Sequence, residues 1–146
     1  MLPSTTTSWK RWRFDNPETV IITRDLGFRR DYTRDPFVGY AERLNDGGTT
    51  PFPVDPDALA DQRLLPAERV VGVEFGGEAA AVAIEMLSGE IEFEVGGQGF
   101  AVVPDFAGGA EVFFVNDDGR SPAPSRSTFW FAYVASFPNA EVIATE

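Results

Sequence analysis

The 146-residue chain contains no cysteine and no histidine, and only Lys10 among its 12 basic residues is a lysine. Without cysteine there is no disulfide, no thiolate nucleophile and no Cys-x-x-Cys redox pair. Without histidine there is no imidazole ligand or imidazole base, so Ser-His-Asp and Cys-His catalysis are excluded within these residues. The common zinc, copper, haem and iron–sulfur sites are excluded for the same reason. What remains is the chemistry of carboxylates, hydroxyls and guanidinium groups.

The composition is that of a folded, soluble domain. Hydrophobic residues make up 43% of the chain and aromatic residues 13%, which is enough to build a core. The net charge of −11 disfavours nucleic acid as a partner. This charge is unevenly spread, because residues 1–43 carry 8 basic and 6 acidic groups whereas residues 44–146 carry 4 and 17.

No targeting or membrane-spanning segment is predicted. Residues 1–12 lack the apolar core of a signal peptide. The longest uncharged stretch, residues 127–140, is shorter than the ~20 residues that cross a bilayer, and it contains Pro138. We therefore expect a cytoplasmic protein, or an extracytoplasmic one if the chain is a fragment of an exported precursor.

The two ends of the chain share a pattern at a constant offset of 121 residues. Trp9, Trp12 and Pro17 correspond to Trp130, Tyr133 and Pro138. Aromatic residues three apart suit one face of a short helix, which a preceding hydroxyl side chain can cap and a following proline ends. A β-branched run follows at residues 20–23 and 142–143. Residues 1–23 and 127–145 are each predicted as helix, proline turn and strand, with chance similarity as the alternative to a duplicated unit.

The middle of the chain divides into an irregular part and a β part. Residues 24–66 are predicted to be irregular, with one or two helical turns at 57–63. Residues 69–115 are predicted as a β meander, with strands at 70–75, 79–84, 91–95, 100–103 and 111–115. Paired glycines at 76–77 and 96–97 supply the positive φ angles of tight hairpins. The sequence thus predicts one α+β domain over residues 1–146: a β-rich antiparallel sheet or small partial barrel with short terminal helices.

The strongest candidate binding site is a segment rich in arginine and tyrosine. Its candidate ligand-binding residues are Arg29, Arg30, Tyr32, Arg34 and Tyr40. Guanidinium groups bind carboxylate or phosphate through paired hydrogen bonds, and a tyrosine can stack or donate a hydrogen bond. Two interleaved aspartates favour the alternative, an internal network of ion pairs that pins this segment to the sheet.

Other polar and aromatic clusters are weaker candidates. Glu90, Glu92 and Glu94 share one strand face and are expected to be solvated rather than to bind a hard cation. A carboxylate pair for hydrolysis would have to be close and buried in a cleft. The aromatic residues of the two ends are expected to seal a core, with a stacking platform as the alternative. No catalytic residue, metal site or cofactor is assigned.

Four stretches in order resemble a prokaryotic family of uncharacterised proteins, domain-of-unknown-function family 3179. They are Thr7-Ser8-Trp9 through Pro17-Glu18-Thr19; Gly27 through Tyr32 with Asp35-Pro36-Phe37 and Tyr40; Arg63 through Val73 with Gly76-Gly77-Glu78-Ala79; and Phe129-Trp130-Phe131-Ala132 with Pro138 and Glu141-Val142. The resemblance covers only the C-terminal part of a typical family member. The Cys-Pro-Leu-Cys motif and nearby histidine of the family are absent here.

The resemblance implies a fold unit and no reaction. We therefore expect a non-catalytic interaction or structural module, as a subunit or remnant of a larger protein, with a protein partner or a second copy. The alternatives are a small-anion-binding domain that uses residues 29–40 and a carboxylate-based hydrolase.

Overall fold

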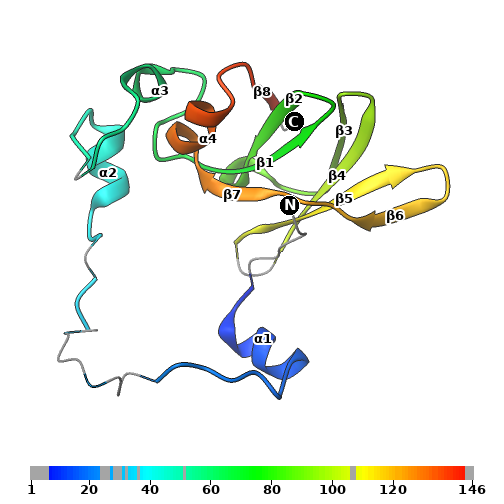
Figure 1. Cartoon of the computed structure of the whole chain (residues 1–146), viewed down its shortest axis with the longest axis horizontal. Coiled ribbons are helices and arrows are strands. Elements are labelled where there is room, and N and C mark those ends of the chain that lie inside the picture. Colours follow the sequence, from blue (N-terminus) through cyan, green and yellow to red (C-terminus); the bar gives the residue numbers. More distant parts are fainter. Residues whose placement is uncertain are drawn as a thin grey trace.

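A computed structural model describes residues 7–23, 27, 31, 33–35, 37–50, 52–105 and 108–143. Two four-stranded sheets and a few short helices make up these residues (Figure 1), which confirms the predicted α+β class. The described strands do not close into a barrel. The helices are α1 (Trp9–Asp15), α2 (Tyr40–Asn45), α3 (Pro56–Ala60), the 3-10 turn η1 (Ile84–Met86) and α4 (Trp130–Ser136).

Sheet A has the strand order β7-β1-β2-β8. Its strands are β1 (Arg69–Phe75), β2 (Glu78–Ala83), β7 (Arg126–Phe129) and β8 (Glu141–Ile143). The β1–β2 hairpin turns at Gly76 and Gly77, whose φ angles of 60° and 87° suit the predicted glycine turn. β7 pairs antiparallel to β1, whereas β8 lies parallel to β2 at the opposite edge.

Sheet B is antiparallel throughout, in the order β3-β4-β5-β6. Its strands are β3 (Ile91–Val95), β4 (Gln98–Pro104), β5 (Ala110–Asn116) and β6 (Gly119–Pro122). The five strands predicted between residues 69 and 115 are all present. They belong to two sheets rather than to one meander, because the chain leaves sheet A through η1 and starts sheet B at Ile91.

The main core lies between the two sheets. Side chains of sheet A, including Val71 and Val82, share one buried cluster with Phe100, Val102 and others of sheet B. The other face of sheet A carries Val70 and Ala81, which are buried under α4. Because neighbouring residues on a strand point to opposite faces, β1 and β2 contribute to both clusters. The layers are therefore α4, sheet A, the main core and sheet B.

Three parts of the secondary structure differ from the sequence prediction. Residues 20–23, predicted as a strand, have no regular secondary structure, so that prediction is wrong. No strand pairs with them among the described residues, and a strand needs a neighbour to satisfy its backbone hydrogen bonds. Strands β6 and β7 and helix α2 were not predicted. In the part of the chain that the structure describes, no helix has the length and apolar character to cross a membrane.

Candidate functional site

The C-terminal unit, defined here as residues 128–143, is docked on sheet A. Trp130 and Tyr133 of α4 are almost completely buried on the outer face of the sheet. The Tyr133 hydroxyl lies 2.8 Å from the carbonyl oxygen of Val73 and 3.0 Å from that of Ala80. Burial raises the pKa of Tyr133, so its hydroxyl stays protonated and donates to the sheet backbone.

Gly72 of β1 makes this close approach possible. A Cβ atom at this position would lie 2.1 Å from Cε2 of the Tyr133 ring, well inside van der Waals contact. The ring therefore rests directly on the backbone of β1, where only glycine leaves room for it. Gly72 thus marks the point on sheet A where an aromatic side chain docks.

Backbone carbonyl groups, rather than a side chain, cap the start of α4. The N–H of Trp130 donates to the carbonyl oxygen of Glu68 at 2.8 Å, and the N–H of Phe131 donates to that of Pro66 at 3.0 Å. No side-chain hydrogen bond caps the helix at Phe129. Thr128, the hydroxyl residue that precedes the helix and was a candidate cap, is instead paired with Val70 in the sheet. These bonds join α4 to the loop that precedes β1.

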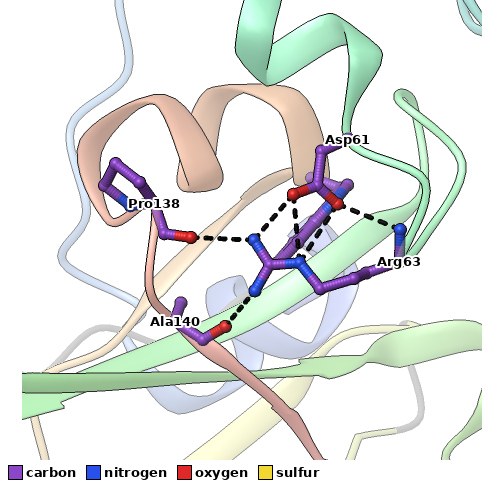
Figure 2. A network of polar contacts seen from close by, with 5 residues as sticks. Asp61, Arg63, Pro138 and Ala140 are labelled. Carbon is purple, nitrogen blue, oxygen red and sulfur yellow. Dashed lines mark hydrogen bonds and ion pairs between the residues drawn. The ribbon is translucent and has the colours of Figure 1, made fainter.

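An ion pair fixes the turn between α4 and β8 (Figure 2). The Arg63 guanidinium donates to the Asp61 carboxylate, with an Nη2–Oδ2 distance of 2.7 Å. It also donates to the carbonyl oxygens of Pro138 at 2.9 Å and Ala140 at 2.5 Å. Through these hydrogen bonds the guanidinium holds backbone groups of the C-terminal unit in place, so Arg63 has a structural role here.

Trp130 completes the same network. Its indole N–H donates to Asp61 Oδ1 at 3.1 Å, and Cζ of Arg63 lies 5.0 Å from the indole ring centre. Hydrogen bonds from the Arg63 guanidinium lower the pKa of Asp61, and those from the backbone N–H of Arg63 and from the Trp130 indole add to the effect. Asp61 therefore serves as an anchoring carboxylate for the buried indole.

The N-terminal unit, defined here as residues 7–23, contains a helix at positions equivalent to those of α4. Trp9 and Asp15 begin and end α1, and Trp130 and Ser136, each 121 positions later, begin and end α4. The C-cap residues agree too: Asn16 has φ −130° and ψ 68°, and Phe137 has −134° and 73°. Of these two helices, α1 alone has a side-chain cap, in which Ser8 accepts from the Arg11 N–H at 3.2 Å. The offset seen in the sequence is thus also a correspondence of helix geometry.

The environments of the two units are opposite. None of the residues of α1 is buried, and Figure 1 draws this helix apart from both sheets. The exposed fractions are 48% for Trp9, 43% for Trp12, 81% for Phe14, 94% for Val20, 57% for Ile21 and 82% for Ile22. Single exposed apolar side chains are ordinary, but six of them lie within the 17 residues of this unit. This exposed set is the candidate functional site.

The surface of α1 also carries positive charge. Lys10, Arg11 and Arg13 are exposed, and with Ser8 and Phe14 they line an open hollow of about 550 Å³. Arg11 pairs with Asp15 one helical turn later, at 2.5 Å. The site therefore combines aromatic side chains with guanidinium and ammonium groups.

The predicted anion site is only partly described. Arg29, Arg30 and Tyr32 lie outside the described residues, and Arg34 is exposed. Tyr40 is buried in an apolar cluster with Leu44, Ala67 and Phe131, a position typical of core packing. The two interleaved aspartates bond locally: Asp31 accepts from Thr33, and Asp35 accepts from the Phe37 N–H at 2.8 Å. Anion binding by this segment stays a prediction.

The carboxylates on the sheets are exposed. Glu90, directly before β3, and Glu92 of β3 both pair with Arg120 of β6, as expected for a solvated strand face. Among the described residues, no Asp or Glu is buried, so the buried pair that a carboxylate hydrolase needs is not found there. The stacking platform is also not assembled, because Trp130 and Tyr133 are in a core while Trp9 and Trp12 are exposed.

Fold and site together define a class: a two-sheet α+β domain with one docked and one exposed helix unit. Residues 1–140 match the model of the family described as a protein of unknown function, DUF3179, and the chain belongs to this family. The resemblance carried by the four sequence stretches is thereby confirmed. A search of curated proteins found no match, and neither did a search of solved structures.

Proposed function

We propose that this chain is a non-catalytic interaction module whose N-terminal unit is its docking surface. A single observation carries the proposal. The helix of the N-terminal unit begins and ends at positions equivalent to those of the C-terminal unit, yet the aromatic and β-branched residues of the N-terminal unit are exposed. Trp and Arg are typical of interface hot spots, and Phe is enriched at protein interfaces in general. Burying these side chains in a complex would remove apolar surface from water, which favours association.

The charge distribution supports a protein partner. Residues 44–146 have 17 acidic and 4 basic groups, so this part of the chain repels other acidic surfaces. The helix α1 instead presents three cations next to its aromatic residues. An acidic partner would therefore be attracted to the N-terminal unit and repelled by the sheets, which orients the encounter.

The proposal is tested by isolating complexes of the full chain from the cells that produce it. We expect one polypeptide to remain with the chain at a fixed ratio through gel filtration and to be identified by mass spectrometry. The Trp9→Ser/Trp12→Ser variant should lose this partner. A matched control, Met86→Ser, removes an exposed apolar side chain from η1 and should retain it. Equal recovery of the partner with both variants, or a chain that is always alone, would contradict the proposal.

A further inference from the structure

We propose that the N-terminal unit docks on a β-sheet of another polypeptide segment. This sheet resembles β7–β1–β2 in having three strands and an open edge strand, and it carries acidic side chains beside the docking site. This inference rests on the proposed function and specifies the partner. The C-terminal unit shows what such a docking site looks like, because that unit occupies one in this structure.

Corresponding residues of the two units define the contacts. Trp9 takes the place of Trp130, and Trp12 that of Tyr133, the two side chains buried on the outer face of sheet A. The Trp12 indole N–H can donate to a strand carbonyl as the Tyr133 hydroxyl does; in this structure it donates to Thr19 Oγ1 at 2.9 Å. The partner strand then needs a glycine or equally small residue under Trp12, as Gly72 lies under Tyr133.

The strand segment corresponds as well. Ile21 and Ile22 take the places of Val142 and Ile143, which lie in β8, parallel to Ala81 and Val82 of β2. Val142 packs against the cluster under α4, and Ile143 packs against the main core. Residues 20–23 would thus become a parallel edge strand on the partner sheet, which supplies the missing backbone partners.

The charge of the partner beside its sheet follows from the positions at which the two units carry different residues. Phe131 is buried in the apolar cluster that contains Tyr40, Leu44 and Ala67, but its counterpart in α1 is Lys10. Val134 is also buried, and its counterpart is Arg13. These cations would be desolvated without a counter-charge in a site like that of the C-terminal unit. The partner therefore carries carboxylates where this chain packs apolar side chains around Phe131 and Val134.

The same mismatch argues against a second copy as the partner. In a second copy the β7–β1–β2 sheet is already covered by that copy's own α4 and β8. The tether through Phe129 keeps the C-terminal unit at a high effective concentration beside its sheet. An N-terminal unit that brings Lys10 and Arg13 cannot displace one that brings Phe131 and Val134.

A fusion of the chain with a copied sheet tests the inference. Residues 61–127 are placed directly before Thr7, so that the copied sheet runs into the N-terminal unit as the original runs into the C-terminal unit. The copied segment contains no tryptophan, so Trp9, Trp12 and Trp130 remain the only ones in both proteins. Acrylamide quenches the fluorescence of accessible tryptophans. In the parent chain it therefore acts on Trp9 and Trp12 and spares the buried Trp130.

In the fusion, we expect Trp9 and Trp12 to lose their quenching and the amides of residues 20–23 to gain hydrogen-exchange protection. The control is Gly72→Val in the copied sheet only, which places a side chain where the Trp12 ring must lie and should restore quenching. For the charge beside the docking site, Ala67→Glu in the copy should strengthen the protection and Ala67→Lys should weaken it, because Lys10 would face this position.

The inference is overturned if Trp9 and Trp12 are quenched as strongly in the fusion as in the parent chain, whether or not the copied sheet folds. A parent chain that sediments as a dimer with both residues protected would overturn it in favour of a second copy. If a stoichiometric partner is isolated but the fusion fails, only the class of partner is wrong. If no partner is isolated, the proposed function itself fails.

Discussion

The two helix units of this protein have the same local structure in opposite surroundings. In the C-terminal unit the aromatic face of α4 is packed on sheet A and the following strand completes that sheet. In the N-terminal unit an equally long helix with equivalent ends has no buried residue, and the following segment forms no strand. Helix length therefore follows from nearby residues, such as the spaced aromatic side chains and the following proline, whereas the strand depends on a neighbour that lies far away in the chain.

The largest expected difference between the units is in their tryptophans. Trp130→Ala removes a fully buried side chain, so we expect it to lower the free energy of unfolding by about 3–5 kcal/mol. Trp9→Ala, at the equivalent position of α1, should change the free energy of unfolding by less than about 0.5 kcal/mol. Urea denaturation followed by far-UV circular dichroism measures both. Equal losses would mean that the N-terminal unit is docked in solution.

Gly72 gives the next largest effect. Gly72→Ala places a Cβ against the Tyr133 ring, so we expect a loss of ~1–3 kcal/mol through overpacking. Tyr133→Leu in the same chain should make that substitution less costly, because the ring is gone. The matched control is Gly89→Ala, which has open space around the added atom and should be neutral. Thermal unfolding of the wild type, the two single variants, the double variant and the control measures these effects. Additive effects of Gly72→Ala and Tyr133→Leu would contradict direct contact.

Asp61→Asn should cost less and should depend on pH. The folded pKa of Asp61 is lowered, so its ionised form stabilises the fold above the unfolded value of 3.8, and this stabilisation is lost as the pH falls through the folded pKa. We expect the substitution to cost about 1 kcal/mol at pH 7, a reduced value because the Arg63 side chain is 39% exposed. Urea titrations at pH 7 and pH 2.5 test this. A difference between wild type and variant that persists unchanged at pH 2.5 would contradict the assignment.

The smallest effect is expected for the ion pair of the N-terminal unit. Arg11 and Asp15 have 70% and 41% exposed side chains, and exposed pairs one helical turn apart add little to stability. Arg11→Gln should leave the urea midpoint unchanged within error, whereas Arg63→Gln should lower it. A clear loss with Arg11→Gln would show that α1 is supported by more than its own helix.

Most of the fold could be predicted because its signals are local. The alternation in Ile91–Val95 and the glycine pairs at 76–77 and 96–97 define hairpins within a few residues. The division into two sheets could not be predicted, since it depends on which hairpin faces share a core. β7 was missed because Arg126–Phe129 runs directly into α4, and the aromatic pattern of the helix dominates that stretch.

The candidate site was only half visible in the sequence. The offset of 121 residues identified both units, and the aromatic residues of both were expected in a core. Burial requires a sheet with a small residue at the right place, and among the described residues Gly72 provides this once, for Tyr133. The exposure of Trp9 and Trp12 is therefore a property of the assembled structure. Lys10 and Arg13, which align with Phe131 and Val134, were the signals that the two units have different surroundings.

The parallel pairing of β8 with β2 has a consequence for the order of folding. Sheet B is complete within residues 91–122, so all its strands are available before β7, α4 and β8 are synthesised. Sheet A needs contacts between Ala81 and Val142, and closing so long a loop is entropically expensive. We expect pulse-labelled hydrogen exchange during refolding to protect β4 and β5 before β8. Until its last strand arrives, a nascent chain exposes the edge of β2, and a helix–strand unit from a neighbouring chain could occupy it transiently.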